Sequence, residues 1–185
     1  MINLFILVFL ILSFYYGYFL ISIVIGLIKL KPVHKKDPVS EFISIIIPFR
    51  NEEDNILLNL KSIESQNYPQ KQFEVIYVDD SSTDNSLEIL KSSIKNENIK
   101  VFSLPENPGE TARKKRAVNF GIENSRGEII VTTDADSFAS PDWLVNLLSA
   151  LDNKTGFISG PVEFIDDKSI FAELQQIEFA GLVLT

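Results

Sequence analysis

The chain has 185 residues, no cysteine, one histidine and a formal net charge of -8, and 45% of its residues are hydrophobic. This length allows one domain with an appendage. Without cysteine the chain forms no disulfide and no thiolate metal site. The negative charge argues against nonspecific nucleic-acid binding, which needs a basic surface. We therefore expect no nucleic-acid partner.

An uncharged run dominated by Ile, Leu, Phe and Val extends from residue 2 to residue 28. About 20 apolar residues are enough for a helix to cross a bilayer. A cleaved signal peptide is the alternative, but no basic residue precedes the run and no small-residue cleavage site follows it. The sequence therefore predicts a transmembrane helix over residues 2–28.

Basic residues follow this run and none precedes it, namely Lys29, Lys31, Lys35 and Lys36. By the positive-inside rule this bias predicts a tether over residues 29–41 on the cytoplasmic side of the cell membrane, with all later residues also cytoplasmic. The single histidine, His34, falls in the tether and is expected to be a solvated linker residue. No histidine-dependent chemistry is therefore expected.

After the tether, apolar β-branched segments alternate with amphipathic ones. Strands are predicted at residues 42–48, 73–78, 99–104 and 128–133, and helices at residues 54–66, 85–95 and 111–124. Strands that alternate with helices indicate an α/β fold with a mostly parallel sheet. Continuous apolar strands indicate that helices cover both faces of that sheet.

Acidic residues stand where two of these strands end. Asp134 and Asp136 follow the last strand, and Asp79 and Asp80 follow the second. Ligands of parallel sheets bind outside the carboxyl ends of the strands. Carboxylates suit Mg²⁺ or Mn²⁺ ions that take further ligands from substrate phosphates. The pattern predicts a nucleotide–metal site. The sequence has no G-x-G-x-x-G or G-K-[ST] motif, which disfavours Rossmann dinucleotide binding and P-loop phosphate binding.

A basic run, Arg113-Lys114-Lys115-Arg116, opens the last predicted helix. Neighbouring side chains on a helix diverge by about 100°, so only one or two of them can face a bound phosphate. The alternative is a solvated or membrane-facing basic patch.

The strings IIIPFRNEE (residues 45–53) and VDDSSTD (residues 78–84) resemble glycosyltransferase family 2, whose members are inverting, nucleotide-sugar-dependent enzymes with the GT-A fold. Further matches follow in the same order at residues 67–69, 114–121, 133–136 and 141–144. The leading apolar helix and the segment Gly160-Pro161-Val162 resemble the membrane-bound branch, which glycosylates lipids or builds polysaccharides. The resemblance implies a GT-A domain over residues 42–185.

For the nucleoside, the resemblance implies that Pro48, Asn51 and Glu52 border the base and ribose. It implies that Asp80 accepts a hydrogen bond from an N–H of the base, uracil in the common case, with Asp79 the less favoured choice.

For the diphosphate, the resemblance implies that Asp134 lies at the ribose and the metal. Asp136 is the main protein ligand of Mn²⁺ or Mg²⁺, and Lys114 lies near the diphosphate.

Structural alternatives remain for several acidic residues. Asp79 and Asp84 are also suited to turns and helix caps. Glu52 and Glu53 are also suited to the first turn of a helix, where the helix dipole favours them.

The family's catalytic base is an acidic residue in a later motif, which in processive members precedes a Gln-x-x-Arg-Trp segment. No segment of this chain matches either feature. Asp166 and Asp167 follow the strand expected at Gly160 too closely to match the motif that carries the base. We therefore expect the chain to be the N-terminal portion of a longer enzyme, with its base beyond Thr185, and to be inactive alone.

Together with the transmembrane helix, the resemblance implies a membrane-anchored glycosyltransferase that moves a sugar from a nucleotide-diphosphate donor, most simply a UDP-sugar, to a lipid or polysaccharide acceptor by metal-assisted inverting displacement. One alternative is a membrane-tethered nucleotide-sugar-binding module or degenerate homologue. A second is a haloacid-dehalogenase-type phosphohydrolase, although its D-x-D motif opens the domain, whereas βα units precede it here.

Overall fold

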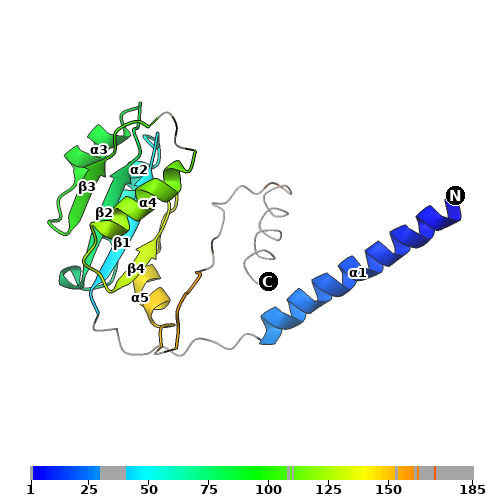
Figure 1. Cartoon of the computed structure of the whole chain (residues 1–185). Helices are drawn as coiled ribbons and strands as arrows, with labels where there is room; N and C mark the ends of the chain where they lie inside the picture. Colours follow the sequence, from blue (N-terminus) through cyan, green and yellow to red (C-terminus); the bar gives the residue numbers. More distant parts are fainter. Residues whose placement is uncertain are drawn as a thin grey trace. The chain divides into compact units, whose positions relative to one another are not determined.

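The structure is a computed structural model that describes residues 2–29, 41–107, 109, 111–152, 154–160, 162 and 169 (Figure 1). The chain divides into two compact units, and the unit formed by residues 35–151 contains every described strand. Most of the predicted tether, residues 30–40 with His34, lies outside the described residues, as do Asp166 and Asp167.

The N-terminal helix α1 runs from Ile2 to Lys29. Its segment Leu4–Gly26 has a mean hydropathy of 2.4 and is 0% buried. The predicted helix is therefore confirmed, and it is long and apolar enough to cross a membrane.

Four parallel strands form one sheet in the order β3-β2-β1-β4. Their bounds are β1 Ile43–Phe49, β2 Phe73–Asp79, β3 Ile99–Ser103 and β4 Ile129–Thr132. The register places Ile43 beside both Phe73 and Ile129, and Val75 beside Ile99. β1 and β2 are buried along their whole length, as their mainly apolar sequences predict.

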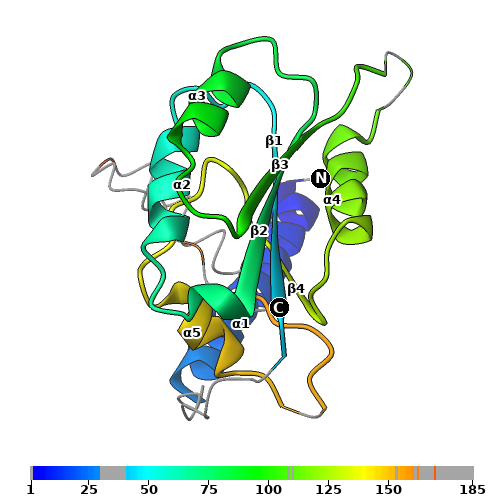
Figure 2. The same ribbon diagram turned by 90° about the vertical axis from the view of Figure 1, so that its left-hand side faces the viewer.

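Helices cover both faces of this sheet (Figure 2). Their bounds are α2 Ile56–Glu64, α3 Ser86–Ser93, α4 Arg113–Glu123 and α5 Trp143–Leu148. Successive side chains of a strand point to opposite faces. Accordingly, Ile46 packs in a cluster with Ala117 of α4, whereas Ile45 and Ile47 pack in a cluster that includes Leu60 of α2.

The structure confirms the predicted α/β class and the predicted strands and helices, with bounds close to those expected. The sequence did not predict α5 or the short 3₁₀ helix η1 at Gln70–Gln72. The strand expected at Gly160 is wrong, because residues 154–160 form no strand and no described residue pairs with the free edge of β4. An apolar sequence cannot form a strand without a neighbour to accept its backbone hydrogen bonds.

Helix α4 reverses the direction in which the sheet grows. β1, β2 and β3 lie side by side in chain order. The chain then crosses the face opposite α2 through α4, so that β4 pairs with the free edge of β1. Gly121 lets α4 pack closely on the sheet, because a Cβ at this position would lie only 2.4 Å from the Ile46 side chain. The carboxyl ends of β1 and β4 therefore flank the topological switch point, where ligands of such sheets bind.

A buried carboxylate, Glu74, joins the amino ends of the strands at the opposite edge of the sheet. Glu74 is 0% exposed and accepts hydrogen bonds from Ser44 Oγ at 2.9 Å, Lys100 Nζ at 2.8 Å and the Arg126 backbone N–H at 2.7 Å. Burial alone would raise the pKa of Glu74, but these hydrogen bonds together lower it. Ser44 Oγ also accepts from the Gly127 N–H, and a Cβ at residue 127 would lie 2.4 Å from the Ser44 nitrogen.

Candidate nucleotide-sugar site

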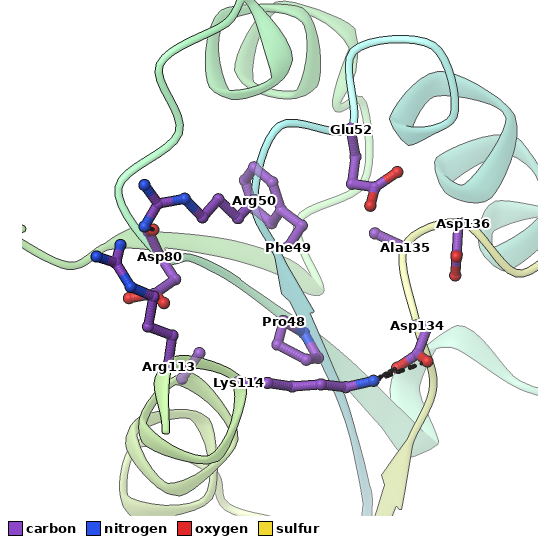
Figure 3. A pocket seen from close by; sticks show the side chains of 11 residues that line it. Pro48, Phe49, Arg50, Glu52, Asp80, Arg113, Lys114, Asp134, Ala135 and Asp136 are labelled. Atoms are coloured by element: carbon purple, nitrogen blue, oxygen red, sulfur yellow. Dashed lines mark hydrogen bonds and ion pairs between the residues drawn. The ribbon is translucent and has the colours of Figure 1, made fainter. Parts of the chain in front are cut away.

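A cavity of about 300 Å³ opens at the carboxyl edge of the sheet, at the switch point (Figure 3). Its walls come from the loops after β1, β2 and β4 and from the first turns of α4. The lining residues are Pro48, Phe49, Arg50, Glu52, Asp80, Arg113, Lys114, Ala117, Asp134, Ala135 and Asp136. Cationic and anionic side chains both face this cavity, as binding of a metal–diphosphate complex requires.

The loop after β1 is tied to the loop after β2 by reciprocal hydrogen bonds. The Asn51 N–H donates to Ser82 Oγ at 3.0 Å, and Asn51 Oδ1 accepts from the Thr83 N–H at 2.8 Å. Asn51 holds a left-handed backbone, with φ 56°, which asparagine tolerates better than most residues. One residue further on, the Glu52 N–H donates to Ser86 Oγ at 2.7 Å. These contacts position Glu52 on the cavity wall.

Acidic residues strengthen the same connection. The Glu53 N–H donates to Asp84 Oδ2 at 3.2 Å, and Glu53 Oε2 accepts from the Asn85 N–H at 3.1 Å. Asp84 Oδ1 accepts from the Ser86 N–H at 3.1 Å. Burial tends to raise the pKa of Asp84, and the hydrogen bonds from Ser86 and Glu53 outweigh it, so the net shift is downward. Both carboxylates therefore hold the loops together, and neither lines the cavity.

A buried asparagine on α2 holds the turn that carries Asp134 and Asp136. Asn59 is 0% exposed and its Nδ2 donates to the backbone carbonyls of Asp134 at 3.1 Å and Ser137 at 2.7 Å. Its Oδ1 accepts from the Tyr77 hydroxyl at 2.7 Å. The amide is thus fixed on both sides, and it fixes the backbone between the two carboxylates.

Lys114 reaches from α4 to Asp134 (Figure 3). Its Nζ lies 2.7 Å from Oδ1 and 2.8 Å from Oδ2 of that carboxylate. The Asp136 carboxylate makes no hydrogen bond or ion pair to the described part of the chain, and it is exposed. Arg113 lines the cavity as well. This corner therefore offers one carboxylate already paired with a cation and a second one free to bind a ligand.

At the other end of the cavity, Asp80 is 3% exposed and paired with Arg116 of α4. Arg116 also donates to the Pro105 carbonyl at 3.1 Å. Figure 3 shows Arg50 extending to Asp80, whose backbone carbonyl accepts from Arg50 Nη1 at 3.3 Å. Among the described residues, Asp80 Oδ2 has no hydrogen-bond partner.

Most of the site residues proposed from the sequence meet in this one cavity. They are Pro48, Glu52, Asp80, Lys114, Asp134 and Asp136. Asn51 and Asp79 do not line it. Asp79 Oδ1 accepts from the Ser82 N–H at 2.9 Å, and Oδ2 accepts from Ser103 Oγ at 2.8 Å. Asp79 therefore acts as a turn residue, the alternative role that the sequence analysis gave it.

Other residues of the site were not singled out from the sequence. Arg50 lies within the family-like string of residues 45–53, from which the sequence assigned it no role of its own. Arg116 could have been found from helical spacing, because it falls three residues after Arg113 and one before the buried Ala117. Asn59 carries no local signal, since its partners lie more than 70 residues away along the chain, at separations of 75 and 78.

The residues present fit a hard divalent cation that shares its ligands with a substrate. Asp134 and Asp136 supply carboxylate oxygens to the same cavity. In the described part of the chain, no group of three or more His, Cys, Asp or Glu side chains could hold a metal ion by itself. A cation at this turn would thus take its other ligands from phosphate oxygens and water.

Comparison with known proteins identifies the class. The family model described as glycosyl transferase family 2 matches residues 44–181, and the chain belongs to that family. The resemblance seen in the sequence is confirmed, and the match favours a glycosyltransferase over the phosphohydrolase alternative.

Curated relatives are longer than this chain. Glycosyltransferase AglE of Haloferax volcanii is 36% identical over 126 residues, which cover 66% of this chain and 40% of AglE. A poly-beta-1,6-N-acetyl-D-glucosamine synthase of Staphylococcus epidermidis is 30% identical over 145 residues, or 77% of this chain and 34% of the synthase. The chain therefore spans less than half the length of these relatives.

Solved structures share the fold. The mannosyltransferase PcManGT of Pyrobaculum calidifontis, in complex with GDP-Man and Mn²⁺, superimposes with a TM-score of 0.64 at 26% identity, over 77% of this chain and 42% of that one. TarS of S. aureus in complex with UDP gives a TM-score of 0.50 at 32% identity, over 56% of this chain and 30% of TarS. The predicted GT-A fold is confirmed.

Proposed function

We propose that this chain carries the donor site of a membrane-anchored glycosyltransferase that moves a sugar from a nucleoside-diphosphate donor to a lipid or polysaccharide acceptor. One observation carries the proposal: the acidic residues after β2 and β4 and the basic first turn of α4 line a single cavity. Such a cavity suits a donor whose base lies near Asp80 and whose diphosphate lies near Lys114 and Asp134.

A UDP-sugar is the donor that we favour. TarS is described in complex with UDP and with UDP-GlcNAc, and PcManGT in complex with GDP-Man and Mn²⁺. Both nucleotides combine a base that carries a ring N–H with a diphosphate. Asp80 accepts such a donor, and a carboxylate with an unused oxygen suits it best.

In the proposed inverting displacement, an acceptor hydroxyl loses its proton to a general base and attacks the anomeric carbon as the bond to the diphosphate breaks. Asp136 and Asp134 would hold Mg²⁺ or Mn²⁺, which supplies Lewis-acid stabilisation of the leaving diphosphate. Lys114 adds positive charge at the same corner, and Arg113 lines the same cavity nearer Asp80 (Figure 3). Asn59 holds the turn, so that both carboxylates stay in place through the reaction.

Membrane anchoring is the second part of the proposal. Helix α1 has the length and hydropathy of a membrane span, and Lys29 is its last residue, on the side where the chain continues to the sheet domain. With the basic residues on that side, the donor site would face the cytoplasm. A lipid-linked or growing polysaccharide acceptor would then meet the site close to the bilayer.

Asp136→Ala tests the donor site. We expect the detergent-purified chain to bind UDP more tightly with Mn²⁺ than with EDTA, in a titration followed by calorimetry. Asp136→Ala should reduce this Mn²⁺ enhancement of UDP affinity at least tenfold, because the unpaired carboxylate is lost. Glu97→Ala, an exposed acid beside the amino end of β3, is the matched control. An unchanged Mn²⁺ enhancement in Asp136→Ala would contradict the metal assignment.

The binding-module alternative shares this donor site and differs only in turnover. Transfer of labelled sugar from UDP-sugars in membranes that contain the protein as the cell makes it separates the two. Donor binding without any transfer would favour the module.

A further inference from the structure

Among the described acidic residues that line the cavity, Asp80 is the one with a buried carboxylate oxygen that has no hydrogen-bond partner. Its backbone N–H donates to the Phe49 carbonyl at 2.9 Å, and its own carbonyl accepts from Arg50. Oδ1 is paired with Arg116, whereas Oδ2 is buried and has no partner in the described part of the chain. Buried polar atoms are nearly always hydrogen-bonded, so an orphaned oxygen in a cavity wall points to a ligand donor.

Arg116 contacts Asp80 just after the carboxyl end of β2. It lies on α4, and its guanidinium contacts both Asp80 Oδ1 and the Pro105 carbonyl. The Arg116 side chain is 23% exposed and that of Asp80 is 4% exposed, so water screens this pair poorly. Both contacts are made by Nη2 of the permanently charged guanidinium, so one Arg116 nitrogen links Asp80 to the Pro105 carbonyl.

We propose that Arg116 is a positioning residue for the nucleotide base. It occupies one oxygen of Asp80 and holds the carboxylate, so that the other oxygen is presented to the base as an acceptor. The proposal rests on the donor site proposed above, and it adds a selection rule. Uracil and guanine carry a ring N–H that can donate to Oδ2, whereas cytosine and adenine present a ring nitrogen lone pair that repels it.

Lys115 provides a matched control for Arg116. It precedes Arg116 on the same helix and carries the same charge, and with Arg116 it lines a second hollow along α4. Lys115 does not line the cavity that contains Asp80. Lys115→Gln therefore removes a neighbouring positive charge without touching the pair.

The experiment measures binding of UDP, GDP, CDP and ADP, each with Mn²⁺, to the detergent-purified chain. We expect the wild type to prefer UDP or GDP to CDP and ADP by at least tenfold. Arg116→Gln should weaken the preferred nucleotide at least tenfold and bring its ratio to CDP towards one. Arg116→Lys should restore part of the preference, and Lys115→Gln should keep it. Equal weakening of every nucleotide by Arg116→Gln would overturn the proposal.

A double-mutant cycle shows whether Arg116 acts through Asp80. In an Asp80→Ala background, Arg116→Gln should weaken UDP binding less than twofold further, because its target is gone. Additive losses would mean that Arg116 acts elsewhere, and would overturn the proposal. The melting temperature of each variant is measured alongside, and Arg116→Lys replaces Arg116→Gln in the cycle if the latter does not fold.

The failure of this inference can be told from the failure of the donor site. If Asp136→Ala abolishes the Mn²⁺ enhancement but Arg116→Gln leaves the base preference intact, the donor site stands and the role of Arg116 is wrong. If the wild type binds none of the four nucleotides with Mn²⁺, both fail.

Discussion

Two buried carboxylates lie at opposite edges of the same sheet, and they differ in how completely they are bonded. Glu74, at the amino edge, is 0% exposed, and both of its oxygens accept hydrogen bonds. Asp80, at the carboxyl edge, is 3% exposed, and one oxygen has no partner among the described residues. Burial and charge are therefore alike at the two edges. What separates a structural carboxylate from a binding one here is its unused acceptor.

The largest expected effect comes from removing the charge of Glu74. Glu74→Gln loses charge-assisted hydrogen bonds from Lys100 and Arg126, so we expect the free energy of unfolding to fall by about 2–3 kcal/mol. Chemical denaturation monitored by circular dichroism measures this. Asp80→Asn is the matched change at the other edge. It should cost less, about 1–2 kcal/mol, because Asp80 loses one charged partner where Glu74 loses two, and it should weaken UDP binding.

The pH dependence of the same comparison has a definite sign. Since the folded-state pKa of Glu74 is lowered, its stabilising contribution is full above the unfolded value of about 4.3. It is lost as the pH falls through the folded value. The stability difference between wild type and Glu74→Gln should therefore be constant near neutrality and shrink below about pH 4.3. Asp84, whose pKa is also lowered, is common to both proteins and cancels. A difference that grows in acid would contradict this account.

A smaller effect on stability, but a specific one on binding, is expected at Asn59. Asn59→Leu removes the donor to Asp134 and Ser137 and leaves the buried Tyr77 hydroxyl without its acceptor, so unfolding should become easier by about 1–3 kcal/mol. With the turn released, the Mn²⁺ enhancement of UDP binding should fall about tenfold, which corresponds to 1.4 kcal/mol. Melting curves and calorimetry test the two parts.

Gln66 supplies the control for this prediction. It is also a buried amide after α2, and it bonds the Ser140 carbonyl at 2.8 Å and the Leu144 N–H at 3.0 Å, beyond the turn that carries Asp134. Gln66→Leu should lower stability by a similar amount and leave the Mn²⁺ enhancement unchanged. If both variants reduce the enhancement equally, general destabilisation explains the result, and the positioning role of Asn59 is wrong.

Local patterns predicted the sheet and the place of the site because both depend on short-range features. Short β-branched apolar runs such as β1 are typical of buried strands, and polar residues directly after parallel strands meet at one edge. The family motifs then assigned roles to Asp80, Lys114, Asp134 and Asp136, which the cavity brings together. Those roles in binding stay predictions.

Features that depend on long-range pairing were not visible in the sequence. Asp79 and Asp80 are adjacent, and only the fold shows that Asp79 is used up by Ser82 and Ser103 while Asp80 faces the cavity. Asn51 matches the family motif, yet its side chain bonds the neighbouring loop. The alternation of side chains along a strand end separates two adjacent acids, but it does not reveal which of them is satisfied.

The smallest expected effect, and the finest test of the two edges, compares two lysine–carboxylate pairs of nearly equal length. Lys100 Nζ lies 2.8 Å from Glu74 with side-chain exposures of 40% and 0%, and Lys114 Nζ lies 2.7 Å from Asp134 with exposures of 67% and 48%. Exposed pairs contribute about 0–1 kcal/mol, because water and salt screen them. Hydrogen bonds to a buried charge contribute more, about 1.5–3 kcal/mol.

We therefore expect Lys114→Gln to change the free energy of unfolding by less than about 0.5 kcal/mol, and Lys100→Gln by about 1–2 kcal/mol. For binding the order reverses: Lys114→Gln weakens UDP and Lys100→Gln does not, because only Lys114 lines the cavity. Denaturation and calorimetry on the two variants measure both effects. If Lys114→Gln destabilised the protein as much as Lys100→Gln, the pair with Asp134 would be part of the fold, and Asp134 would not be free to exchange its lysine for a metal–diphosphate ligand.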